Sequence, residues 1–166
     1  GMCAFQGCES LTDINIPGRV TNIDSGAFTG CINLINVKIP KSVTSIGACT
    51  FAGCSNLTSI KIPESVNSIG RYIFSDCSSL TSLEMPKSLT SIGDYAFRDC
   101  SNLVNIKIPQ NVSSMGKYTF SDCSSLTNIE LSESLTSIGD SAFRNCSSLE
   151  SIKIPESVNG IDEYAF

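Results

Sequence analysis

Residues 57–79 read LTSIKIPESVNSIGRYIFSDCSS, and this 23-residue stretch decides the fold. It opens on Leu57, after which Ile60 and Ile62 alternate with polar residues, as in a strand with one buried face. Pro63 ends that strand, because proline lacks the N–H group that a sheet ladder needs. The opening of the stretch therefore predicts a short strand whose apolar side faces a core.

The remainder of the stretch predicts a path back to the next copy of the strand. Residues 66–69 favour a second short extended segment, and Gly70 permits a sharp corner after it. Ile73, Phe74 and Cys77 then fall at i, i+1 and i+4, which favours a single helical or 3₁₀ turn.

This pattern recurs every 23 residues without a slip of one residue. All eight phenylalanines keep the step, and so do seven of the nine cysteines: Phe5, Phe28, Phe51, Phe74, Phe97, Phe120, Phe143 and Phe166, then Cys8, Cys31, Cys54, Cys77, Cys100, Cys123 and Cys146. A period of this length is typical of stacked repeats, each packed only on its neighbours. We expect a single, mostly β domain over residues 1–166, with about seven 23-residue repeats and parallel pairing between coils. Since the chain opens inside a repeat, we expect it to be a piece of a longer protein.

Composition excludes several classes of function. The net charge is −5 and there is no basic run, which disfavours a nucleic-acid partner. No apolar stretch approaches the roughly 18 residues that membrane insertion requires. The chain has no histidine, the commonest catalytic base and metal ligand. We therefore expect no enzyme activity, catalytic residue, metal or cofactor.

The regular cysteines form one column, about 5 Å apart between coils. Buried free thiols that donate weakly to backbone carbonyls fit this column best, because stacked side chains point in parallel rather than toward each other. A disulfide ladder and a metal site are the alternatives. A straight row with one ligand per coil does not make a tetrahedral cage.

The polar strand positions give a candidate ligand-binding face. One column alternates in sign from its third member onward and consists of Asn15, Lys38, Lys61, Glu84, Lys107, Glu130 and Lys153. Alternating charges suit stacked pairs on a parallel sheet, so the face could be solvated and self-paired. The alternative is a ligand surface, formed by Lys38, Lys61, Glu84, Lys107, Glu130 and Lys153 on the inner side of the solenoid.

Two further rows lie on the turns. Tyr72, Tyr95 and Tyr118 occupy one column, either as an aromatic ladder at a corner or as an exposed contact strip for protein or sugar. Asp76 and Asp99, with Asp122 one coil further, form a row of carboxylates that are either solvated or bound to calcium.

The repeated string Leu-x-x-Ile-x-Ile-Pro-x-Ser-Val-Thr-Ser-Ile-Gly-x-x-Ala-Phe-x-x-Cys resembles the BspA-like leucine-rich repeat of bacterial and protist surface proteins. Residues 80–100 match it closely, with Leu83, Met85 and Leu89 as apolar replacements. The resemblance implies a right-handed leucine-rich-repeat solenoid, or horseshoe, with its short helical or 3₁₀ turns on the convex side. It also implies a cell-surface or secreted location, and it supplies no catalytic residues.

The resulting expectation is a non-catalytic adhesion or recognition module that binds a protein or glycan at a cell surface. The alternative is a structural spacer or self-assembly module without a specific ligand. The terminal coils carry no polar cap, which predicts end-to-end self-association through unpaired strand edges.

Overall fold

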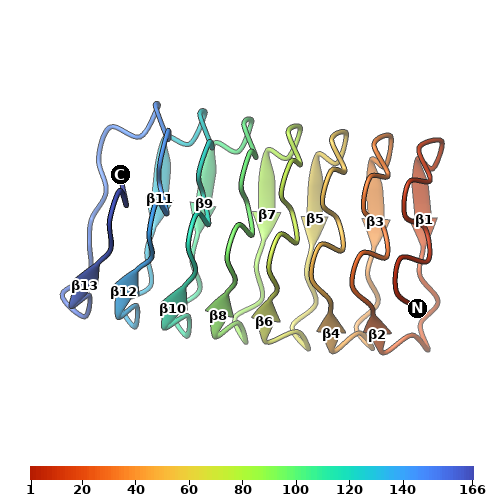
Figure 1. Ribbon diagram of the computed structural model, residues 1–166. Helices are drawn as coiled ribbons and strands as arrows, with labels where there is room; N and C mark the ends of the chain where they lie inside the picture. Colours follow the sequence, from red (N-terminus) through yellow and green to blue (C-terminus); the bar gives the residue numbers. More distant parts are fainter.

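The computed structural model describes residues 1–166 and shows a row of similar coils stacked side by side (Figure 1). Nearly every coil contains a three-residue strand followed by a two-residue strand. The three-residue strands are β1 (Asp13–Asn15), β3 (Asn36–Lys38), β5 (Ser59–Lys61), β7 (Ser82–Glu84), β9 (Asn105–Lys107) and β11 (Asn128–Glu130). The two-residue strands are β2 (Asn22–Ile23), β4 (Ser45–Ile46), β6 (Ser68–Ile69), β8 (Ser91–Ile92), β10 (Ser114–Met115), β12 (Ser137–Ile138) and β13 (Gly160–Ile161).

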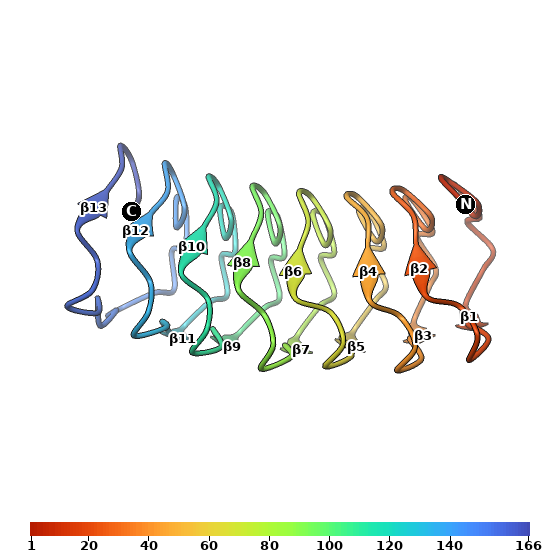
Figure 2. The same cartoon turned by 90° about the horizontal axis from the view of Figure 1, so that it is seen from below.

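All strand pairs are parallel and in register with the 23-residue period, so Ile60 lies opposite Leu83 and Lys61 opposite Glu84. The two-residue strands form a second row along the stack (Figure 2), within which β6, β8, β10, β12 and β13 make one five-stranded sheet. The predicted parallel solenoid is confirmed.

The three-residue strands do not form one uninterrupted sheet, which corrects the continuous pairing expected from the sequence. They make three separate pairs, β1 with β3, β5 with β7, and β9 with β11. No hydrogen-bonded ladder joins β3 to β5, although the two strands are neighbours in the stack (Figure 1). Lys38 and Lys61 occupy equivalent positions on these strands, and like charges oppose close pairing. Charge alone does not account for the interruptions, because β7 and β9 are also unpaired although they carry Glu84 and Lys107.

The segment after each two-residue strand consists of successive single turns and contains no helix, which corrects the expected helical or 3₁₀ turn. The reason is the backbone: Tyr72 and Asp76 have φ angles of 56° and 61°, and a left-handed residue interrupts a right-handed helical run. Instead, the N–H groups of Tyr72 and Phe74 donate to the carbonyls of Asp94 and Ala96 in the next coil, at 3.0 and 2.9 Å. The turns therefore add a third line of hydrogen bonds between coils.

Two columns of these turns have positive φ. One consists of Gly7, Gly30, Gly53, Asp76, Asp99, Asp122 and Asn145, and the other of Cys3, Gly26, Cys49, Tyr72, Tyr95, Tyr118, Ser141 and Tyr164. Glycine, asparagine and aspartate tolerate this conformation best, so backbone geometry accounts for the aspartate row. The other column is unusual because left-handed backbone costs a bulky residue about 1–2 kcal/mol.

The core is a single cluster of 38 buried apolar residues between the strand rows and the turns. Phenylalanine rings from successive coils stack through it with centroids 5.2–5.7 Å apart. Close packing also fixes the glycine after the second strand: a Cβ on Gly116 would stand 2.5 Å from the backbone nitrogen of Asp94. The glycine column thus allows coils to approach, in addition to turning a corner.

All nine cysteines are free thiols, and five of the seven regular ones are buried, as the buried-thiol interpretation of that column predicts; Cys8 is exposed and Cys146 is partly buried. Each regular cysteine from the second coil onward donates its S–H group to the phenylalanine carbonyl of the preceding coil. Cys77, for example, donates to Phe51 and Cys100 to Phe74, both at 3.1 Å. The same carbonyls also accept the backbone N–H of the cysteine three residues later, as Phe51 does from Cys54 at 3.1 Å, so each thiol is a second donor to a carbonyl that has two lone pairs.

Burial of the thiol column predicts loss of stability at high pH. Burial raises the pKa of Cys54 to about 12, whereas an unfolded thiol titrates near 8.5. Below that value both states are protonated and the thiol has no effect. Between about pH 9 and 12 only the unfolded state releases the proton, so stability falls by about 1.4 kcal/mol per pH unit for this thiol. Urea denaturation under reducing conditions should show a shallower decline in Cys54→Ala; an equal slope in both proteins would contradict the assignment.

The left-handed backbone at Asp99 predicts a difference between two replacements. Asp99→Gly and Asp99→Ala both remove the carboxylate, but only glycine adopts a φ of 59° without strain. The glycine variant should be more stable by about 1 kcal/mol in chemical denaturation. Equal stabilities would show that the turn relaxes to another conformation.

Candidate functional site

The face of the solenoid that carries the three-residue strands, here called the long-strand face, holds the predicted lysine and glutamate column. Lys61 and Glu84 form an ion pair of 2.8 Å between β5 and β7, and Lys107 pairs with Glu130 between β9 and β11. The bond from Lys61 to Glu84 raises the pKa of the lysine. Because these side chains are mostly exposed, such pairs contribute little to stability.

Lys153 departs from the stacked pattern. It lies 3.3 Å from Glu133, a residue outside the strand column, instead of pairing with Glu130. Glu130 already forms an ion pair with Lys107. Towards the C-terminal end of the long-strand face, the lysine charges are thus largely compensated by neighbouring glutamates.

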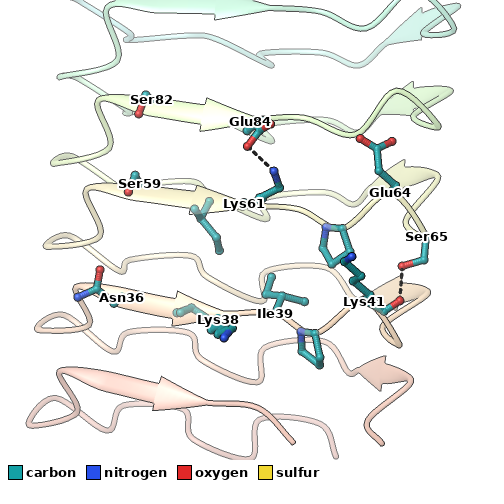
Figure 3. A pocket seen from close by; sticks show the side chains of 14 residues that line it. Asn36, Lys38, Ile39, Lys41, Ser59, Lys61, Glu64, Ser65, Ser82 and Glu84 are labelled. Carbon is teal, nitrogen blue, oxygen red and sulfur yellow. Dashed lines mark hydrogen bonds and ion pairs between the residues drawn. The ribbon is translucent and has the colours of Figure 1, made fainter. Parts of the chain in front are cut away.

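A groove of about 1070 Å³ crosses the long-strand face over β3, β5 and β7 (Figure 3). It lies where the ladder between β3 and β5 is interrupted. Among its lining residues are polar strand residues and the proline corners that follow the strands: Asn36, Lys38, Ile39, Pro40, Lys41, Ser59, Lys61, Pro63, Glu64, Ser65, Ser82 and Glu84. The groove therefore combines backbone edges with several charged side chains.

Positive charge is only partly compensated in this groove. Neither Lys38 nor Lys41 has a carboxylate oxygen within 4.0 Å of its ammonium group, whereas Lys61 is paired with Glu84. The carboxylate of Glu64 accepts a backbone hydrogen bond from Lys87 at 2.9 Å. The arrangement leaves two exposed cations available to an anionic ligand.

The structure brings some of the predicted face residues together and separates others. Lys38, Lys61 and Glu84 share the groove, while Lys107, Glu130 and Lys153 lie further along the stack. Lys41 also lines the groove, but the sequence analysis did not single it out. It follows the proline corner, so it falls outside the alternating strand pattern that identified the other lysines.

The three predicted tyrosines form a stacked ladder on the turns. Ring centroids are 4.5 Å apart between Tyr72 and Tyr95 and 4.9 Å between Tyr95 and Tyr118, with planes within 4° in both pairs. The rings are half-buried, and burial followed by the neighbouring tyrosines raises the pKa of Tyr95. Arg71 stacks over Tyr72 with its guanidinium carbon 5.8 Å from the ring centroid. This ladder presents an aromatic edge at the surface.

The aspartate row is held by local partners. Arg98 lies 3.0 Å from Asp99. Asp122 accepts hydrogen bonds from Asn145 and, with a smaller effect, from Ser121, and both bonds lower its pKa. Burial raises the pKa of Asp99 despite the opposing effect of Arg98. No group of three or more cysteine or acidic side chains is arranged to hold a metal ion.

The structure has no helix that is long and apolar enough to span a bilayer. A search of curated proteins found no match.

Solved structures give strong matches. A leucine-rich repeat protein from Bacteroides ovatus is 37% identical with a TM-score of 0.90 and covers 93% of this chain. The T. pallidum leucine-rich repeat protein is 30% identical with a TM-score of 0.85 and covers 90%. This chain spans 43% of the first protein and 72% of the second. The pneumococcal vaccine antigen PcpA, at 20% identity and a TM-score of 0.58, shares the fold alone.

The comparison with family models agrees with these structures. The BspA type leucine-rich repeat region matches residues 1–82 and 68–166, with six copies of the repeat. Together these ranges extend over the whole solenoid. Leucine-rich-repeat solenoids of this kind generally serve as scaffolds for protein interaction. The chain belongs to the BspA-type leucine-rich repeat family.

Proposed function

We propose that this solenoid is a non-catalytic recognition module of a surface-displayed protein, and that it binds an acidic segment of a partner protein in the long-strand groove. The observation that carries the proposal is the uncompensated positive charge of Lys38 and Lys41 beside the interrupted ladder. A carboxylate between Lys38 and Lys61 would relieve their mutual repulsion. The surface location is what membership of the family leads us to expect.

The dimensions of the groove favour a peptide segment over a small molecule. Its volume of about 1070 Å³ exceeds the common range of small-molecule pockets, roughly 300–1,000 Å³. It crosses three strands, so an occupant contacts several coils at once. Polar side chains such as Asn36, Ser59 and Ser82 line it and supply hydrogen-bond partners for a peptide backbone.

A structural spacer is the second candidate function. It is favoured by the self-paired half of the long-strand face, where Lys107 and Lys153 are both engaged with glutamates. A spacer needs no uncompensated charge, however, and the groove has two such lysines. The two functions therefore differ in what neutralising Lys38 and Lys41 should do.

Binding of a labelled peptide of alternating glutamate and glycine separates the two functions. Lys38→Gln with Lys41→Gln should weaken binding about tenfold, since each exposed ion pair contributes up to about 1 kcal/mol. The matched control, Lys107→Gln with Lys153→Gln, removes the same charge outside the groove and should leave affinity nearly unchanged. Fluorescence anisotropy provides the measurement, and a glutamine version of the peptide provides the baseline.

Two results would favour the spacer instead. One is equal weakening by both double variants, which indicates attraction to charge anywhere on the molecule. The other is no difference between the glutamate and glutamine peptides. The same variants should then be tested on purified extracellular-matrix proteins and a glycan array. Binding to glycans but to none of the proteins would identify a glycan, and not a protein, as the ligand.

A further inference from the structure

The tyrosine ladder is interrupted at one coil. After Tyr72, Tyr95 and Tyr118 the column continues with Ser141 and then returns to tyrosine at Tyr164. The φ angles of Tyr118, Ser141 and Tyr164 are 54°, 53° and 54°, so the backbone is the same in all three coils. Only the side chain differs, and the serine leaves space between two aromatic rungs.

That space is a slot of about 450 Å³ lined by Tyr118, Ser141, Arg144, Tyr164 and Phe166. Tyr118 and Tyr164 are two coils apart, roughly 9–10 Å along the stack. A flat ring inserted midway would meet a tyrosine on each face at about the spacing that the ladder already keeps, 4.5–4.9 Å. The slot thus has the width of one aromatic ring.

The polar side chains of Ser141 and Arg144 differ in whether they already have a hydrogen-bond or ion-pair partner. Ser141 is only 1% exposed and donates its hydroxyl hydrogen to Asp140 at 3.1 Å, so the floor of the slot is already satisfied. Arg144 is exposed and has no carboxylate within 4.0 Å. Arg144 acts electrostatically on Asp122 without forming an ion pair. Its guanidinium is therefore the charged group in the slot that remains available to a ligand, beside the hydroxyls of Tyr118 and Tyr164.

Comparison with an equivalent coil shows how this arose. Residues 93–100 read GDYAFRDC and residues 139–146 read GDSAFRNC, which differ at only two positions. The first difference is Ser141 in place of tyrosine, and it opens the slot. The second is Asn145 in place of aspartate, and it removes the partner that holds Arg98 in the equivalent coil at 3.0 Å. Both changes act in the same coil, one creating a space and the other releasing a cation beside it.

We propose that this slot binds an aromatic side chain of a partner protein that is followed by an acidic residue. The ring would stack between Tyr118 and Tyr164, and the carboxylate would pair with Arg144. A sugar ring is the alternative occupant, since the hydroxyls of Tyr118 and Tyr164 can bond to it. The full positive charge of Arg144 favours an occupant that carries a carboxylate. This site is separate from the long-strand groove and does not depend on the function proposed for it.

Tryptophan fluorescence gives a direct test, since the chain has no tryptophan and excitation at wavelengths that tyrosine does not absorb makes only the probe emit. The probe is the capped peptide Gly-Trp-Glu-Gly, and its glutamine counterpart measures the role of the carboxylate. Titration of the full chain should show saturable binding that is weaker for the glutamine peptide. Ser141→Tyr should fill the slot and reduce affinity for both peptides at least about tenfold.

Two arginine variants separate the carboxylate contact from general electrostatics. Arg144→Gln should weaken the glutamate peptide about fivefold and leave the glutamine peptide unchanged. Arg98→Gln is the matched control in the equivalent coil and should affect neither. Unfolding midpoints of all variants verify that each remains folded.

Three outcomes would overturn the proposal. Unchanged binding in Ser141→Tyr would place the peptide elsewhere. Equal affinity for Gly-Trp-Glu-Gly and a peptide with glycine in place of tryptophan would show that no ring enters the slot. Glycan binding that is lost in Ser141→Tyr, with no binding of the tryptophan peptide, would assign the slot to a sugar.

Discussion

Stacking in strict register is the constraint on which the rest of this structure depends. Every residue lies next to its equivalent 23 positions away, so each column must be compatible with itself. Phenylalanines satisfy this by stacking ring on ring, and cysteines by donating to the carbonyl of the preceding coil. The strand column satisfies it by alternating in sign, as Lys61 and Glu84 do, and the aspartate row by pairing with arginine, serine and asparagine side chains. The long-strand groove lies over the interrupted pairing of β3 and β5, where Lys38 and Lys61 are neighbours of like charge.

The apolar columns could be predicted from the sequence because burial and period act together on them. Phe74, Cys77 and Leu80 are all fully buried, as their spacing indicates. The free thiols followed from the parallel direction of stacked side chains. These features depend on side-chain type and spacing alone, both of which are visible in a single sequence.

The turns and the interrupted sheet could not be predicted in the same way. The spacing of Ile73, Phe74 and Cys77 fits a helical turn, but left-handed backbone at Tyr72 and Asp76 rules it out. Glycine at three members of the aspartate column was the available signal for that conformation. In the tyrosine column Gly26 gives such a signal at one position, and tyrosine itself gives none. The groove depends on which neighbouring strands pair, which the repeat does not specify.

Both proposed sites lie where the chain departs from its own repeat. At the long-strand groove the departure is a pair of like charges, and at the slot it is a serine in a tyrosine column together with an asparagine in an aspartate column. Each departure gives up contacts that the regular repeat makes elsewhere, although Asn145 gains a hydrogen bond to Asp122 at 2.7 Å. The account therefore treats the repeat as the source of stability and its irregularities as the source of recognition.

The free energy of unfolding of the double variant Ser141→Tyr with Asn145→Asp tests this view most directly, because residues 139–146 then become identical to residues 93–100. The account predicts an increase of about 1 kcal/mol, because two new ring contacts and an ion pair with Arg144 outweigh the loss of the hydrogen bond from Asn145 to Asp122. Unchanged or reduced stability would contradict it, since the irregular coil would then be at least as stable as one that follows the repeat.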